Sequence, residues 1–151
     1  MNNVTENIYL LEEVKTIYKK RNRSNTKIKS YIDAIDYLKK FINFEELTEE
    51  HFYTIYLNKA NNVVGWHHIS MGSIAGTVVS ITKILKSALD CYACGLVIIH
   101  NHPSGNHRPS EADKVMTDRI KQSAKIMDIE LIDSIIVTHE ESFSFANEGL
   151  I

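Results

Sequence analysis

Two histidines and an aspartate in the second half of the chain have the residue types and spacing of a metal site. His100 and His102 are two residues apart at the end of an apolar run, 95–100, which is typical of a buried strand. Because side chains two apart on a strand point to the same face, both imidazoles would point to one spot. Asp113 lies in the first turn of the next expected helix, and its carboxylate can turn back toward the strand end. Two histidines and one carboxylate leave one tetrahedral position for water, which is the pattern of a catalytic zinc site.

Each part of this pattern also has a purely structural explanation. A histidine pair at a strand end can be a partly exposed polar terminus. Ser110 and Asp113 can be an N-cap serine and an acidic first-turn residue, which stabilise any helix start. Taken together, these explanations do not account for two histidines on one strand face before a helix that opens with a carboxylate. The sequence therefore predicts that a metal ion joins the strand end to the helix start.

The elements around this site predict an α/β sandwich with a mixed central β-sheet. The expected order is strand, helix, two strands, helix, strand, helix and two strands. The hydrophobic periodicity predicts helices over residues 30–43, 81–92 and 110–127. It predicts strands over residues 14–19, 51–57, 63–70, 95–100, 130–137 and 142–146.

The helices carry two more detailed predictions. Ser30 and Asp33 have the spacing of a capping pair at the start of the first helix. In the third helix, four apolar residues are expected to face the core: Val115, Ile120, Ala124 and Met127. A turn is expected at 72–76, before the second helix.

Composition limits the class of protein. The chain has 151 residues, of which 44% are hydrophobic and 24% charged, with a net charge of -2. This profile indicates one globular domain and excludes a disordered chain or a whole-chain attraction to nucleic acid. The sequence has no apolar stretch of membrane-spanning length, and its first residues are not expected to form a signal peptide, so a cytoplasmic location is expected. The two cysteines, Cys91 and Cys94, are expected to pack as small core residues rather than to act in redox or zinc chemistry.

Basic residues gather in the first part of the chain. We expect residues 1–29 to form an N-terminal strand and a basic arm, and residues 30–151 to form the metal-site domain. Phosphates of a nucleic acid are a possible partner for six side chains of the arm: Lys19, Lys20, Arg21, Arg23, Lys27 and Lys29. Few aromatic residues are interleaved with them, so a solvated loop is the simpler expectation.

From His100 to Asp113 the chain reads HNHPSGNHRPSEAD, which resembles the His-x-His…Ser-x-x-Asp motif of JAMM/MPN-plus metalloproteases. The longer string is similar to the RadC-type branch of that family. Further matches are Gly76-Thr-Val-Val, the stretch 129–133 and the ending 142–150, so the resemblance covers 14–151. It implies an MPN/JAB-like fold, with a mixed sheet flanked by about three helices.

The resemblance also implies roles for individual residues. His100, His102 and Asp113 match the zinc ligands. Ser110 matches a serine that stabilises the tetrahedral intermediate or holds the water. The family's general base is a glutamate just before the hairpin, a position that Glu50 fits; the adjacent Glu49 would face the opposite side of the strand. The implied reaction is hydrolysis of a peptide or isopeptide amide bond in a protein or peptide substrate.

Two departures from the family are visible. Many RadC-type chains have a histidine where this chain has Ser134, which affects an expected role beside the ligands rather than metal binding itself. Full-length RadC proteins begin with a helical DNA-binding domain that this chain is expected to lack, so a link with DNA repair is expected to be weaker. Besides a metallohydrolase, a nucleic-acid-associated protein and a catalytically silent MPN module remain as alternatives.

The other histidines are expected to lie outside the metal site. His67 and His68 are adjacent and should face opposite sides of their strand. His107, with Arg108, lies in the loop after the His-x-His pair, where it could meet a substrate anion or stay exposed. His51 and His139 are expected at the surface.

Overall fold

The computed structural model describes residues 8–9, 14–15, 25–72 and 79–151. The helices are α1 (Tyr31–Lys39), α2 (Ile81–Asp90) and α3 (Glu111–Ile126), with a short 3-10 helix η1 (Phe44–Glu46). The strands are β1 (Ile8–Tyr9), β2 (Val14–Lys15), β3 (His51–Leu57), β4 (Val63–Met71), β5 (Gly95–Asn101), β6 (Glu130–Val137) and β7 (Ser142–Ser144).

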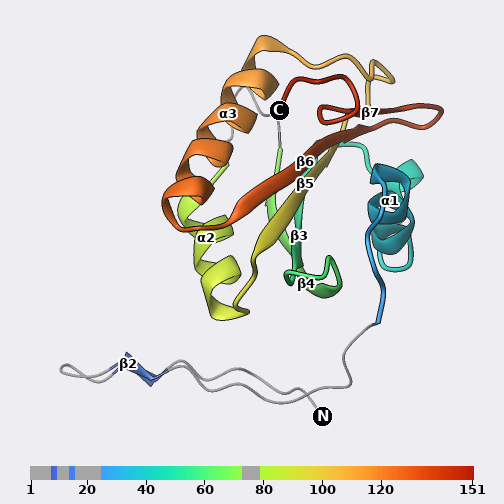
Figure 1. Cartoon of the computed structure of the whole chain (residues 1–151). Helices are drawn as coiled ribbons and strands as arrows, with labels where there is room; N and C mark the ends of the chain where they lie inside the picture. The colour runs from blue at the N-terminus through green and yellow to red at the C-terminus, as the bar shows by residue number, and fades with distance from the viewer. Residues whose placement is uncertain (1–7, 10–13, 16–24, 73–78) are drawn as a thin grey trace.

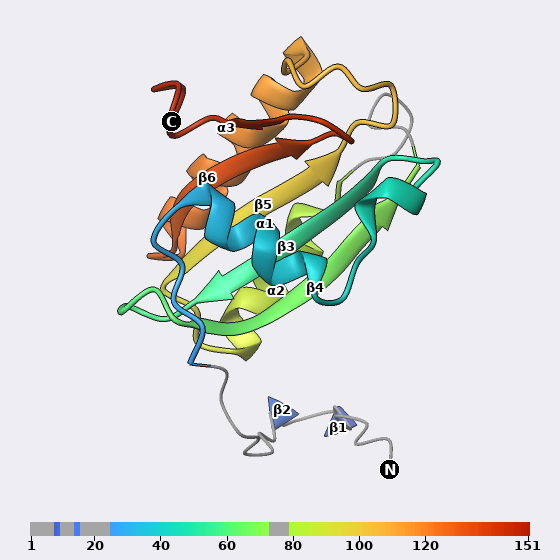
Figure 2. The same ribbon diagram turned by 90° about the vertical axis from the view of Figure 1, so that its right-hand side faces the viewer.

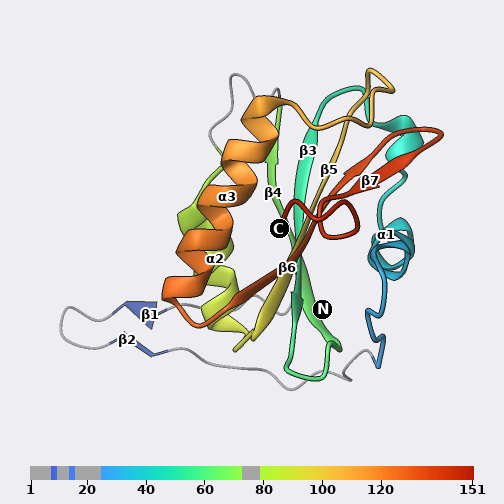
Figure 3. The same ribbon diagram turned by 45° about the horizontal axis from the view of Figure 1, so that its top comes forward.

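Five strands form one mixed sheet in the order β4-β3-β5-β6-β7. Neighbours pair antiparallel except β5 and β6, which are parallel. Helix α1 covers one face of the sheet, and α2 and α3 cover the other (Figures 1 and 3). The predicted fold class, an α/β sandwich around a mixed sheet, is confirmed.

The alternation of side chains along β5 builds a core on each face. Val97 and Ile99 pack in the α1 core, and Leu96 and Ile98 pack in the core beneath α2 and α3. All four are almost completely buried. Because the period is two, the next even position, His100, falls on the face that α2 and α3 cover.

Three chain segments meet at one end of this sheet. Strand β5 ends there, β3 begins there, and α3 starts there after the loop that follows β5 (Figures 2 and 3). The antiparallel register pairs Phe52 with His100 at that end. The end of the central strand is therefore the place where residues far apart in sequence come together.

Helix α1 starts as the sequence predicts and ends earlier. Ser30 and Asp33 form the expected capping box. The helix ends at Lys39 rather than near residue 43, and η1 follows. The side chain of Asn43 accepts a hydrogen bond from the backbone N–H of Glu45 and so caps η1, which accounts for the separate short turn.

The predicted inward face of α3 is partly wrong. Val115 is 57% exposed and Met127 is 41% exposed. Ile120 and Ala124 are buried as predicted, but the stripe continues through two polar residues, Asp113 and Thr117. These polar side chains can be buried because both have polar partners, as described below. A prediction that selects only apolar residues therefore assigned the wrong positions to the buried face of α3.

The N-terminal predictions are only partly within the described residues. The expected strand 14–19 is described only at 14–15, where it pairs with β1 rather than with the five-stranded sheet. The end of the expected arm, 25–29, is held by a hydrogen bond from Ile28 N–H to the carbonyl of Asn61, at 2.9 Å, and Ile28 is buried. Lys27 and Lys29, on either side of it, are exposed.

Several predictions lie outside the described residues. They are the four basic residues Lys19, Lys20, Arg21 and Arg23, the Gly76-Thr-Val-Val match and most of the turn at 72–76. The division into an arm (1–29) and a domain (30–151) stays a prediction. Within the described ranges, no helix is long and apolar enough to cross a membrane.

Candidate metal centre

The side chains of His100, His102 and Asp113 meet at the end of β5. The two Nε2 atoms lie 3.0 Å apart. Asp113 Oδ1 lies 3.2 Å from Nε2 of His100, and Asp113 Oδ2 lies 3.5 Å from Nε2 of His102. All three residues are buried, with Asp113 only 1% exposed. The structure therefore brings together the three residues that the sequence predicts as ligands, and they form a group able to hold a metal ion.

These distances fit a zinc ion. Zinc bonds of about 2.0–2.1 Å at tetrahedral angles separate neighbouring ligand atoms by about 3.3 Å. A buried carboxylate needs compensation, yet Asp113 Oδ1 is buried without a hydrogen bond in the described structure. A cation between the three side chains would supply that compensation, so the donor set and its orphaned oxygen suit a divalent metal.

The charges of the three groups support one another. Burial alone would raise the pKa of Asp113, but the close imidazoles of His100 and His102 and the hydrogen bonds from Ser110 hold that pKa far below its usual value. Burial likewise acts to lower the pKa of His102, and the hydrogen bonds to Asp113 and to the Asn106 carbonyl outweigh it, so that pKa is raised. An ionised carboxylate is thus kept next to the imidazoles, as metal binding needs, and a protonated His102 would release its proton when a metal ion binds.

A backbone carbonyl orients the second histidine. Nδ1 of His102 lies 2.7 Å from the carbonyl oxygen of Asn106, in the loop between β5 and α3. A neutral ring that donates from Nδ1 would have its Nε2 lone pair free for a metal ion held between His100 and Asp113. This arrangement of a ligand ring fixed by an outer hydrogen bond is usual in metal sites.

Ser110 fixes the carboxylate of Asp113. Its hydroxyl accepts from the N–H of Asp113 at 3.1 Å and donates to Asp113 Oδ2 at 2.7 Å. Its own N–H also donates to Asp113 Oδ2, at 2.7 Å. The N-cap of α3 and the orientation of the carboxylate are therefore one hydrogen-bonded unit. The predicted helix cap is present, and the same contacts orient the carboxylate that is predicted to bind a metal.

Glu50 lies next to the group and Glu49 points elsewhere. Glu50 directly precedes β3, and the pair Phe52–His100 brings the start of β3 next to the end of β5 that carries the imidazoles. Glu50 is half-buried and lines a small cavity with His100, and its charge contributes to the raised pKa of His102. Glu49 is exposed. The geometry thus favours Glu50 over Glu49 as the glutamate at the site.

Comparison with known proteins adds the family. The profile of the RadC-like JAB domain matches residues 28–150. The chain belongs to the RadC-like JAB domain family. This confirms the resemblance of the HNHPSGNHRPSEAD stretch and gives the fold its place among MPN/JAB-like α/β domains.

Curated relatives of this RadC-like domain bear names that state no activity. A UPF0758 protein of Flavobacterium johnsoniae is 40% identical over 82% of this chain and 53% of its own length. A UPF0758 protein of Pelodictyon phaeoclathratiforme is 32% identical over 95% of this chain and 64% of its own length. The UPF0758 protein YfjY of Escherichia coli is 37% identical over 78% of this chain and 72% of its own length. The chain spans little more than half the length of the first of these relatives.

The departure at Ser134 has a local explanation in this RadC-like domain. Ser134 is fully buried on β6, and its hydroxyl lies 2.9 Å from the hydroxyl of Thr117. Thr117 is one turn after Asp113 on α3. The pair therefore links α3 to β6 one helical turn after Asp113, and each buried hydroxyl has a hydrogen-bond partner.

The remaining histidines lie apart from the ligand group. His67 and His68 face opposite sides of β4, as predicted: His67 contacts Ser87 of α2 at 2.8 Å, and His68 contacts His51 at 3.0 Å. His51 is half-buried by that contact, although the sequence placed it at the surface. His107 pairs with Glu141 at 2.5 Å. His139 is exposed, as expected.

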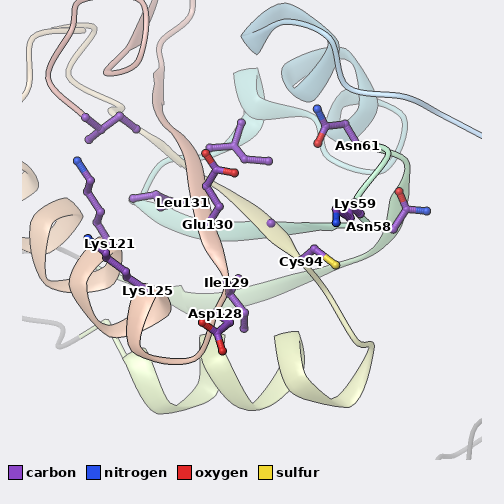
Figure 4. Close-up of a pocket in the computed structure, with 13 residues that line it drawn as sticks. Asn58, Lys59, Asn61, Cys94, Lys121, Lys125, Asp128, Ile129, Glu130 and Leu131 are labelled. Carbon is purple, nitrogen blue, oxygen red and sulfur yellow. The ribbon is translucent and has the colours of Figure 1, made fainter.

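A cavity of about 790 Å³ lies at the opposite end of β5 from the histidines (Figure 4). Lys121 and Lys125 of α3 line it together with Glu130 and Cys94. Cys94 is exposed there, so the expectation of a core position is wrong for it, whereas Cys91 packs against the α2–α3 core. None of the predicted site residues lines this cavity.

Two contributors to the site were missed by the sequence reasoning. The carbonyl of Asn106 has no side-chain signal, because any residue supplies a carbonyl. Asn101, between the two histidines, does have a signal: it is an amide at the end of an apolar strand, and it is 3% exposed.

Proposed function

We propose that this RadC-like domain is a zinc-dependent hydrolase of the JAMM type, which cleaves a peptide or isopeptide amide bond. The observation that carries the proposal is the buried convergence of His100, His102 and Asp113 with an orphaned carboxylate oxygen. Three ligands of this kind leave one coordination position for water, as catalytic zinc sites do.

Each side chain has a role in the proposed reaction. Zinc in this site would lower the pKa of a bound water to about 7 and polarise the substrate carbonyl. Glu50 accepts the proton of the attacking water and passes it to the leaving amine. His102, fixed by the Asn106 carbonyl, and Asp113, fixed by Ser110, hold their positions during the reaction, so little reorganisation is needed.

Ser110 has a second role in the proposal. It donates a hydrogen bond to the oxyanion of the tetrahedral intermediate, as the family's serine implies. In the structure its hydroxyl donates to Asp113 Oδ2. The role at the oxyanion therefore requires that this bond be exchanged when substrate arrives.

The metal is tested by elemental analysis of purified protein. Wild type is expected to hold one zinc per chain, and His102→Ala and Asp113→Ala are expected to hold none, because two ligands remain. Circular dichroism checks that the variants are folded. A folded variant that still holds one zinc per chain would show that the ligand assignment is wrong.

The reaction is tested on a mixture of peptides from a digested, unrelated proteome, together with peptides joined through a lysine isopeptide bond, incubated in water enriched in ¹⁸O. Mass spectrometry then detects new carboxyl ends that carry the label. Glu50→Gln is expected to keep zinc and to lose at least 100-fold in cleavage, since general-base catalysis contributes about 10²–10⁴-fold. Glu49→Gln, the neighbouring exposed residue, is the matched control and should cleave as wild type does.

A zinc-loaded wild type that releases no labelled peptide would favour the catalytically silent module. Equal cleavage by the Glu50→Gln variant would instead show that another group acts as the base.

Nucleic acid remains the second candidate partner, and with it a link to DNA repair. Among the described residues, exposed Lys27 and Lys29 on either side of buried Ile28 favour it. Binding of double-stranded DNA should weaken steeply with salt if the arm contacts phosphates. Neutralising the six basic residues of the arm should remove that dependence, and absence of binding at low salt would exclude this partner.

A further inference from the structure

Asn101 makes a buried contact across the sheet that the proposed reaction does not use directly. Its Oδ1 accepts a hydrogen bond from the N–H of His51 at 2.7 Å. Its Nδ2 donates to the carbonyl oxygen of Glu49 at 2.9 Å. One amide side chain therefore pairs with a backbone group of the residue before Glu50 and with a backbone group of the residue after it.

This contact lies where the regular backbone hydrogen bonding between β3 and β5 stops. The pairing of β3 with β5 runs from Leu57–Gly95 to Phe52–His100 and does not extend to residues 49–51. The amide of Asn101 replaces the missing ladder bonds on this side. On the other side, the carbonyl of Glu50 accepts from the N–H of Gly72 at 2.8 Å. The backbone around Glu50 is thus held by Asn101 of β5 on one side and by Gly72, the residue after β4, on the other.

Asn101 also links this segment to the ligands. It lies between His100 and His102 in sequence, and its amide reaches across to the backbone on either side of Glu50. Any change in the end of β5 therefore moves the imidazoles and the segment that carries Glu50 together.

We propose that Asn101 is a positioning residue, which fixes the carboxylate of Glu50 relative to the metal ligands. This inference rests on the proposed function, because it assigns the purpose of the contact to general-base catalysis. A packing role alone does not explain the contact. An apolar side chain of the same size would fill the space but would leave the Glu49 carbonyl and the His51 N–H without partners.

The activity test compares Asn101→Ala, Glu50→Gln and the double variant on one peptide found by the ¹⁸O assay. Asn101→Ala is expected to keep one zinc per chain, to lower kcat by about 100-fold and to leave KM within a few-fold, since a displacement of about 1 Å can cost that much. In the Glu50→Gln background, Asn101→Ala should lower kcat no further. If the two losses multiply instead, Asn101 does not act through Glu50 and the proposal is overturned.

Thr54→Val is the matched control. Thr54 is a fully buried polar residue of β3 whose hydroxyl has no hydrogen bond within the described structure. Its replacement perturbs the same sheet without removing a hydrogen bond to residues 49–51, so kcat should stay within two-fold of wild type. A loss as large as that of Asn101→Ala would show a general effect of the sheet and would overturn the proposal. Should Asn101→Ala not fold, Asn101→Ser replaces it in every comparison.

Hydrogen exchange gives a readout without substrate. The His51 amide should be protected in wild type and should exchange at least ten-fold faster in Asn101→Ala, whereas amides in the middle of β5 should be unchanged. Unchanged exchange at His51 would overturn the proposal. A wild type that holds no zinc or cleaves no peptide would overturn the proposed function instead, and His51 exchange would still decide whether Asn101 holds the segment.

Discussion

At the scale of single residues, two buried aspartates of this domain are treated oppositely by their surroundings. Asp113 faces two imidazoles, and its pKa is lowered. Asp133 of β6 accepts hydrogen bonds from Ser144, from the N–H of Ala146 and from the N–H of Ser134, but no cation faces it among the described residues. Burial then outweighs those bonds, and its pKa is raised above the ordinary 3.8.

The raised pKa of Asp133 predicts a pH dependence of stability. The folded protein binds this proton more tightly than the unfolded chain, so the stabilisation is fully present below pH 3.8 and is lost as the pH rises through the folded pKa. Against Asp133→Asn, which cannot ionise, wild type should gain free energy of unfolding as the pH falls from 7 toward 4. Urea unfolding of both proteins measures the difference, and a constant or opposite trend would contradict the assignment.

The sequence predicted some residues of the candidate site and missed others, for a physical reason. His100, His102 and the choice of Glu50 over Glu49 follow from the period of two along a strand, which is local. The contact of Asn101 with residues 49–51 and the contact of His51 with His68 depend on strand register, which no local pattern states. Residues that act through a distant backbone group are therefore the ones that were missed.

At the scale of elements, the same capping box opens two helices with different consequences. Ser30 and Asp33 close the start of α1, and Ser110 and Asp113 close the start of α3. Only the second box uses a carboxylate that also faces two histidines. The two boxes therefore form a natural pair for separating helix stability from metal binding.

Serine-to-alanine replacement in both boxes tests that separation. Ser30→Ala and Ser110→Ala should each lower the free energy of unfolding of the metal-free protein by about 1 kcal/mol, as lost N-caps do. Only Ser110→Ala should also weaken zinc binding, by about 10–100-fold, because it frees the ligand carboxylate. Competition with a coloured chelator measures the affinity. Equal zinc affinity of both variants would show that Ser110 does not orient Asp113.

The elements themselves were predicted well where the hydrophobic period was regular. Strands β3, β5 and β6 and the starts of α1 and α3 lie where the sequence placed them. The prediction of the buried face of α3 was partly wrong because the first two turns of the helix bury Asp113 and Thr117 rather than apolar residues. Near the candidate metal site, polar residues are buried as core residues are. A prediction that assigns only apolar residues to the buried face of a helix then fails.

At the scale of the whole molecule, stability is divided between two cores that share one sheet. Ile98 packs beneath α2 and α3, and the adjacent Ile99 packs beneath α1. Both are completely buried. Neither face of the central strand is open to water, so the strand that carries the histidines is supported from both sides.

Truncation on either face should destabilise the whole domain. Ile98→Ala and Ile99→Ala are each expected to cost about 2–5 kcal/mol. Val115→Ala, on the exposed side of α3, should change stability by less than about 0.5 kcal/mol. Denaturant unfolding followed by circular dichroism and by Trp66 fluorescence measures this. A large effect of Val115→Ala would contradict the orientation of α3.

Removal of the metal should lower the stability of the whole fold. A ligand that binds only the folded state adds about 2.7 kcal/mol at one hundred times its Kd. Chelation should therefore lower the Tm of wild type by several degrees and leave the Tm of His102→Ala unchanged. Equal shifts in both proteins would show that the chelator acts elsewhere.

The two capping boxes also bear on how such domains are found in genomes. Ser-x-x-Asp begins α1 as well as α3, and at α1 it does nothing beyond starting a helix. A diverged relative that has stopped using a metal would still benefit from the aspartate, and selection for a sound helix would retain it. Sequence surveys that separate metal-binding members from members without a metal should therefore rely on the two histidines and the upstream glutamate. The aspartate alone distinguishes the two groups poorly.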